Sequence, residues 1–179
     1  VPVTNIHRDE ILDGEDLPGC LQRVVLNRIT VLNAEDSGGD IWGSAKYVTV
    51  QYSAFLYSLH PNTHSHAPGG VSGQERQYLS IHHNLYAHNH ERQPNIRDNN
   101  WDYNLEQNIM HAWDPFGFGG GFATDFRCRP DASGGCPRRV NLRRNVWTSS
   151  PATPAESLSH ALDFRDGANP AEVYMEGNR

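Results

Sequence analysis

A short motif recurs six times in this chain. It consists of an apolar residue, a second apolar residue two positions later and, three positions after that, usually an asparagine. The six copies begin at Val24, Val48, Leu79, Tyr103, Val140 and Val173. The intervals of 24, 31, 24, 37 and 33 residues exclude a strict short repeat. They fit a coil with one short strand per turn and loops of varying length.

The asparagines constrain the fold further. Four copies carry asparagine at the third site, at Asn84, Asn108, Asn145 and Asn178, where the chain must bend after a short strand. In a stacked coil these amides would lie above one another and hydrogen-bond along the axis. An antiparallel meander would not keep one phase across six copies. We therefore predict an all-β chain folded as a right-handed parallel β-helix, with a β-sandwich as the alternative.

Length and composition agree with a turn-rich β domain. The 179 residues form a single predicted domain, 1–179, with about six rungs between residues 22 and 178 and an irregular, acidic lead-in at 1–21. Sixteen glycines and eleven prolines indicate many turns. Because the pattern is still running at residue 178, we expect a β-helix that is truncated at one or both ends or is part of a larger protein.

Charge and hydropathy restrict the classes of partner that the chain can bind. The net charge of −6 gives no overall basic field for nucleic acid. No apolar run approaches the roughly 20 residues that a membrane-spanning helix needs. The first residues, VPVTNIHRDE, lack the basic and apolar regions of a signal peptide, so we expect any such peptide to be already removed or to lie outside this sequence.

The three cysteines indicate whether the protein works in an oxidising or a reducing compartment. Cys128 and Cys136 flank a short loop, CRPDASGGC, that a disulfide could close, which would imply an oxidising environment. The alternative is two unpaired thiols in a flexible loop. Cys20 has no evident partner in the sequence.

The segment ERQPNIR places two arginines, Arg92 and Arg97, around Pro94. Proline fixes its own φ and disfavours helix in the residue before it, so the segment is extended or turned. Two guanidinium groups on a stiff segment suit a carboxylate or phosphate partner. The alternative is a pair of surface arginines with no ligand.

Two further groups of residues could bind ions. Asp36 and Asp40 flank a Gly-rich turn and offer the hard oxygen ligands that calcium takes, against the alternative of a solvated Asx-turn. Seven of the ten histidines lie between residues 60 and 90. His82 and His83 are adjacent on a predicted strand and should point to opposite faces. We therefore favour groove-lining histidines over a transition-metal site.

The segment NIMHAWDPFGFGGGF carries aromatic residues among glycines. On an exposed loop, rings such as that of Trp113 would pack on the apolar face of a sugar and contribute to substrate binding. The alternative is that they pack against the coil.

Several motifs together resemble the pectate lyases of polysaccharide lyase family one. HHNLYAHNHERQPNIR resembles the family's strand followed by R-x-P-x-x-R, and KYVTVQYSAFLYSLHPNTHSHAPGG resembles the preceding rung with its H-P-K-G loop. NIMHAWDPFGFGGG is similar to the rung N-V-I-Y-N-W-G-x-x-x-x-G-G, and NVWTSSPATP is similar to N-Y-Y-K-P-G-P-A-T. The resemblance covers residues 22–178, and the family's fold is the right-handed parallel β-helix.

The resemblance implies a chemistry. In these enzymes an arginine removes the C5 proton of a galacturonate, the C4 oxygen leaves by β-elimination, and Ca²⁺ on the substrate carboxylate acidifies that proton. Carried over by position, Arg92 would be the base and Arg97 would hold a substrate carboxylate. Asp36 and Asp40 would bind Ca²⁺. We thus expect a secreted lyase acting on polygalacturonate or a related acidic polysaccharide.

This chain departs from the family pattern at one substrate-binding position. Asn62 stands where the family has lysine, with His60 and His64 beside it. A neutral amide cannot replace an ammonium group against a carboxylate. The second hypothesis is therefore a non-catalytic β-helix that binds polysaccharide or serves as a structural module of a larger assembly. Hydrolysis by paired carboxylates is a third, weaker hypothesis.

Overall fold

The computed structural model describes residues 2–4, 10–12, 23–34, 40–41, 47–57, 77–97, 101–114, 123–127, 139–165 and 172–179. Almost all regular structure in these residues is β-strand, and every strand pairing is parallel. A short 3₁₀ helix, η1 (Ala155–His160), is the exception. No helix in the described part of the chain has the length and apolar character needed to cross a membrane.

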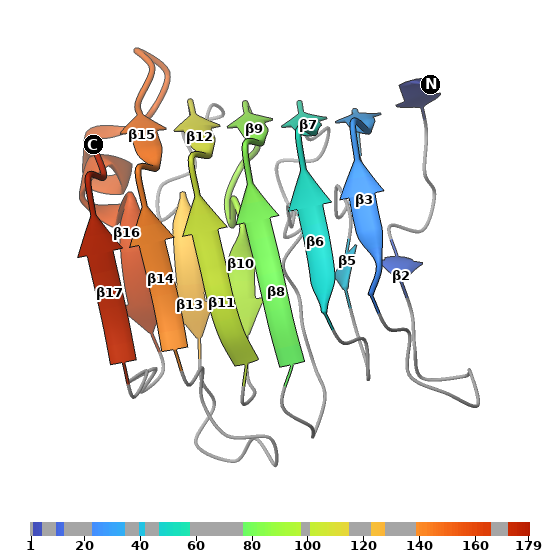
Figure 1. The fold of residues 1–179 in the computed structure, drawn as a ribbon. Helices are drawn as coiled ribbons and strands as arrows, with labels where there is room; N and C mark the ends of the chain where they lie inside the picture. Colours follow the sequence, from blue (N-terminus) through green and yellow to red (C-terminus); the bar gives the residue numbers. More distant parts are fainter. Residues whose placement is uncertain are drawn as a thin grey trace.

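The strands form three larger sheets and one two-stranded sheet (Figure 1). The first sheet has the order β17 (Glu172–Glu176), β14 (Arg139–Arg143), β11 (Trp101–Glu106), β8 (Gln77–His82), β6 (Val48–Gln51) and β3 (Val25–Asn27). The second has the order β1 (Pro2–Thr4), β4 (Thr30–Leu32), β7 (Ala54–Leu56), β9 (Leu85–Ala87), β12 (Ile109–His111) and β15 (Val146–Thr148). The third comprises β10 (Asn95–Arg97), β13 (Thr124–Arg127) and β16 (Leu162–Arg165), and β2 (Glu10–Leu12) pairs with β5 (Asp40–Ile41).

Successive strands visit the three sheets in a fixed order. The trio β8, β9 and β10 places one strand in each sheet, and the trios β11–β13 and β14–β16 do the same, each beside the one before. Within these trios, parallel neighbours in a sheet are therefore one full trio apart in sequence, as the recurring motif requires. The predicted all-β class and the parallel pairing of strands are confirmed.

The recurring apolar residues of the four middle copies form the core, whereas Val173 and Met175 of the last copy are exposed. Val50, Ile81, Leu105 and Leu142 occupy equivalent register positions in the first sheet, and each is fully buried. On each strand, the residues directly before and after the core residue point to the opposite face, because side chains alternate in a strand. Phe55 and Tyr86 of the second sheet close the core from another side, with ring centroids 5.2 Å apart.

The predicted asparagine ladder is present. Asn84 Nδ2 donates to Asn108 Oδ1 (3.1 Å), Asn108 Nδ2 to Asn145 Oδ1 (3.0 Å), and Asn145 Nδ2 to Asn178 Oδ1 (3.2 Å). Each Nδ2 also donates to a carbonyl of the first sheet, at 2.7–2.9 Å. Ser53 takes the next place and donates its backbone N–H to Asn84 Oδ1 at 2.9 Å. The amides thus bind neighbouring turns together along the stack.

A left-handed residue precedes each ladder position. The chain leaves the first sheet through one residue with φ between 50° and 61°, and the next residue enters the ladder or an equivalent place. These bend residues are Arg28, Tyr52, His83, Gln107, Arg144 and Gly177. The turn is short because one residue at positive φ bends the backbone between a strand of the first sheet and the following strand of the second. The asparagine side chain can then reach inward.

Candidate functional site

The segment after β9 contains the buried ion pair Glu91–Arg92. Arg92 Nε lies 2.8 Å from Glu91 Oε1, and the two side chains are only 6% and 8% exposed. Arg92 has φ 62°, which turns the backbone just before the cis peptide bond between Gln93 and Pro94. The first arginine of the R-x-P-x-x-R segment is therefore held inside the fold by its own neighbour.

Hydrogen bonds fix this segment against the strand of the next turn. The backbone N–H of Gln93 donates to the Ala123 carbonyl, and Thr124 Oγ1 donates to the Gln93 carbonyl at 3.0 Å. The backbone N–H of Asp125 donates to the Pro94 carbonyl at 3.2 Å. The segment thus enters β10 in register with β13.

A buried carboxylate supports the same segment from the other side. Asp114 is fully buried, and its Oδ1 lies 3.4 Å from His90 Nε2 while its Oδ2 accepts a hydrogen bond from Ser157 Oγ at 2.8 Å. Its backbone N–H donates to the carbonyls of Asn89 and His90. The carboxylate lies between hydroxyl and imidazole, so the imidazole cannot activate the serine as in a hydrolase triad. We interpret this cluster, which sequence reasoning missed, as structural.

The register of the third sheet aligns three arginines. Arg97, Arg127 and Arg165 occupy the same position on β10, β13 and β16. Parallel neighbours are about 4.8 Å apart, and register partners share a face of the sheet. Two positions earlier lie Asn95, Asp125 and Asp163, again in register. The three-stranded sheet therefore carries a row of arginine positions beside a row that contains two aspartates.

The structure separates the residues that the sequence proposed for the site. Arg97 ends β10, one strand away from Arg127 and in register with it, whereas Arg92 is buried beside Glu91. Trp113 is 2% exposed and donates from its indole N–H to the Ser157 carbonyl at 2.9 Å. The indole therefore packs in the core, as the packing alternative expects, and does not offer a ring face to a sugar.

Other proposed residues lie beyond the described structure. Asp36, His60, Asn62 and His64 are outside the described residues, as are the three cysteines. Asp40 begins β5, where the backbone alone is described. Within the described ranges, no group of three or more His, Cys, Asp and Glu side chains is placed to hold a metal ion. The calcium site of Asp36 and Asp40 stays a prediction.

The expectation that His82 and His83 diverge is wrong. His83 is a bend residue with φ 57°, so it does not follow the alternation of the strand. Its Nδ1 lies 2.9 Å from His82 Nδ1, and its ring packs on Tyr52 with centroids 4.8 Å apart. The two rings share a hydrogen bond at the outer edge of the bend.

Burial and a neighbouring imidazole weaken proton binding by two histidines. Partial burial, then the charge of His83, lowers the pKa of His82 below its usual 6.5, and Glu106 opposes this shift. Partial burial, then the charge of His111, lowers the pKa of His88.

These shifts predict a loss of stability on acidification. A lowered pKa means that the unfolded chain takes up these protons first, so stability falls as the pH drops below about 6.5. We expect thermal unfolding midpoints, measured from pH 8 to pH 5, to fall less steeply in the double variant His82→Gln/His88→Gln. Carboxylates titrate in both proteins, so the difference between the two curves isolates the histidines. Parallel curves would contradict the prediction.

Comparison with protein-family models, with curated proteins and with solved structures finds no match to this chain. The function of the site therefore rests on the residues themselves and on the resemblance of motifs.

Proposed function

We propose that this chain is a right-handed parallel β-helix domain of a secreted polysaccharide lyase. It binds polygalacturonate or a related uronic-acid polymer along the third sheet and cleaves it by calcium-assisted β-elimination. Two features support the β-helix: the repeated visits of successive strands to three parallel sheets, and the asparagine ladder at the bend.

The observation that carries the proposal is the row of arginine positions formed by Arg97, Arg127 and Arg165. These three positions lie in register on adjacent strands, and the backbones of neighbouring strands are about 4.8 Å apart. A polyuronate supplies a regular series of carboxylates, and arginine binds carboxylates in a bidentate manner. The net charge of the chain is −6, so this local row is not a by-product of a basic protein.

The chemistry needs a base at C5 and neutralisation of the uronate carboxylate. Removal of the C5 proton and cleavage of the C4–oxygen bond leave a double bond between C4 and C5 in the product. Ca²⁺ on the carboxylate would stabilise the negative charge that develops beside C5. Arg92 is the candidate base, but its guanidinium contacts Glu91 in this structure. Proton abstraction by Arg92 therefore requires that its guanidinium first leave this contact and lose a proton, because a protonated guanidinium cannot accept one.

The same contact favours a second candidate function. A guanidinium that is buried and paired with a carboxylate is suited to holding a loop in place rather than to exchanging protons. A non-catalytic domain that binds acidic polysaccharide would use the arginine row of the third sheet and leave Arg92 in its structural pair.

Ultraviolet absorbance of the unsaturated product separates the two functions. We expect the absorbance to rise when polygalacturonate is added at alkaline pH, and EDTA to stop this rise. The variant Arg97→Ala loses a charged contact, so we expect its rate of absorbance increase to be at least about tenfold lower. Arg144→Ala removes an exposed arginine from the bend and is the matched control. A flat trace, with polymer binding retained in affinity electrophoresis, would select the non-catalytic module. A folded protein that neither cleaves nor binds uronate polymers would overturn both.

A further inference from the structure

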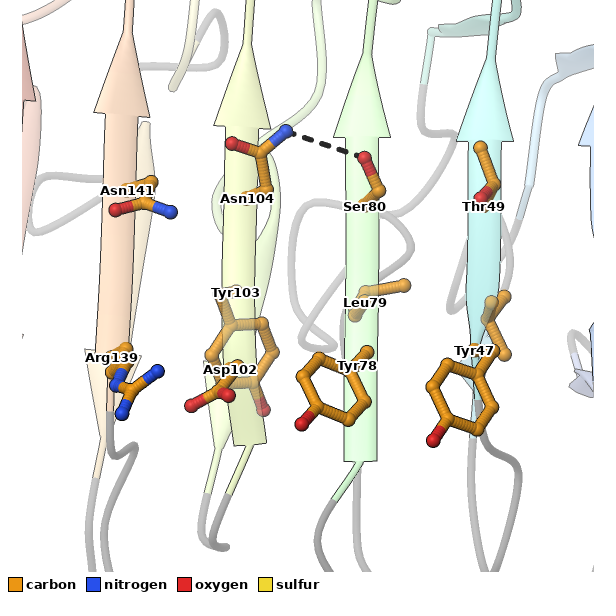
Figure 2. Close-up of a pocket in the computed structure, with 11 residues that line it drawn as sticks. Tyr47, Thr49, Tyr78, Leu79, Ser80, Asp102, Tyr103, Asn104, Arg139 and Asn141 are labelled. Carbon is orange, nitrogen blue, oxygen red and sulfur yellow. Dashed lines mark hydrogen bonds between the residues drawn. The ribbon is translucent and has the colours of Figure 1, made fainter.

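A shallow groove of about 410 Å³ runs across the outer face of the first sheet (Figure 2). It crosses β6, β8, β11 and β14, so it lies on a different sheet from the arginine row. The side chains that line its floor from the outer face are Tyr47, Thr49, Tyr78, Ser80, Asp102, Asn104, Arg139 and Asn141.

Two exposed tyrosines form one end of the groove. The rings of Tyr47 and Tyr78 are nearly parallel, with centroids 5.1 Å apart and an interplanar angle of 8°. They remain 51% and 37% exposed although each covers part of the other. Cross-strand ring pairs stabilise sheets, so the pair alone indicates packing. Its position at the end of a polar groove is what suggests a ligand.

A row of uncharged polar side chains lies beside the tyrosines, two residues further along the strands (Figure 2). Thr49, Ser80, Asn104 and Asn141 occupy the same register position on four adjacent strands. Asn104 Nδ2 donates to Ser80 Oγ at 3.3 Å (Figure 2). Hydroxyl and amide groups both donate and accept hydrogen bonds, as sugar hydroxyls do. Neighbouring strands are about 4.8 Å apart, close to the length of one pyranose unit.

The charges of the groove balance. Asp102 and Arg139 are register partners on β11 and β14, and they are the only charged side chains among the lining residues. Arg139 also pairs with Glu172 of β17, at 3.1 Å, farther along the sheet. A groove with no net charge offers no attraction to a polyanion, in contrast to the arginine row of the third sheet.

We propose that this outer face binds a neutral polysaccharide whose sugar rings pack against the tyrosine pair and whose hydroxyls hydrogen-bond to the polar row. The proposal does not depend on the proposed function, because the residues and the sheet are different. A domain with both surfaces would bind a neutral chain on one side and an acidic chain on another.

Affinity electrophoresis with hydroxyethyl cellulose, xyloglucan or β-1,4-galactan in the gel tests the proposal. We expect at least one of these polymers to retard the protein, and the variant Tyr47→Ala to weaken that binding at least about fivefold. Tyr57→Ala is the matched control, because Tyr57 is also 51% exposed, has φ 56° against 55° for Tyr47, and stacks on one neighbour, His88. Circular dichroism verifies that each variant is folded.

A second variant tests the polar row. Asn141 is exposed, so Asn141→Ala should leave the fold intact and still weaken binding of the same polymer. Absence of retardation by all three polymers, or equal weakening by Tyr47→Ala and Tyr57→Ala, would overturn the proposal. Retardation by polygalacturonate alone would also overturn it. Arg97→Ala should leave binding of the neutral polymer unchanged, which separates this surface from the third sheet.

Discussion

Replacement of Asn108 by alanine is expected to lower the free energy of unfolding by about 4 kcal/mol. Its Nδ2 donates to the Ile81 carbonyl at 2.8 Å and to Asn145 Oδ1 at 3.0 Å. Its Oδ1 accepts from the backbone N–H and from Nδ2 of Asn84, both at 3.1 Å. Each lost bond costs about 1 kcal/mol, and the groups left behind are buried, so water cannot replace the amide.

Urea or thermal unfolding of Asn104→Ala provides the control. Asn104 lies on the outer face of the same strand region and makes one side-chain hydrogen bond, to Ser80. We expect that change to cost less than about 1 kcal/mol. Equal losses in the two variants would show that the ladder contributes little to the stability of the stack.

Arg92→Ala is expected to destabilise the protein by about 3–5 kcal/mol, whatever its effect on activity. The change leaves the buried carboxylate of Glu91 without the guanidinium that lies 2.8 Å from it. Loss of activity in this single variant would therefore not identify Arg92 as a base. The unfolding free energy must be measured beside the rate.

A double-mutant cycle with Glu91→Gln measures the coupling of the pair. We expect the double variant to be more stable than the sum of the two single changes predicts, since it lacks both charges of the pair. The exposed pair Arg143–Glu176, at 3.1 Å with side chains 37% and 43% exposed, is the matched control, and Arg143→Ala should cost less than about 1 kcal/mol. A cost for Arg92→Ala as small as for Arg143→Ala would contradict the structural role.

The parallel stack could be predicted because its determinants are periodic and local. Two apolar residues and an asparagine recur at one phase, and the structure places Ile81 and Leu105 in register and joins Asn84, Asn108 and Asn145 into a ladder. Alternation along a strand and the need to satisfy a buried amide suffice to derive these features.

The surroundings of the candidate site could not be derived in this way. Alternation fails at His83, because one positive φ brings its ring to His82. The burial of Arg92 depends on Glu91, its immediate neighbour, and on a loop whose conformation has no period. The burial of Trp113 depends on η1, which provides the Ser157 carbonyl and comes 44 residues later in sequence. Such contacts follow from tertiary structure and have no counterpart in the spacing of motifs.

The bend residues affect which substitutions the protein can tolerate on the surface that they form. Five of the six positions carry side chains at a positive φ, a conformation that costs an L-residue roughly 1 kcal/mol and glycine almost nothing. Glycine at any of these five positions would remove the conformational cost of the positive φ, yet among the six bend residues only Gly177 is a glycine. Because the ladder beside them holds the turns together, the bend residues can be exchanged without altering the core. The bend positions are therefore places where new surface side chains can be selected or engineered at a modest cost in stability.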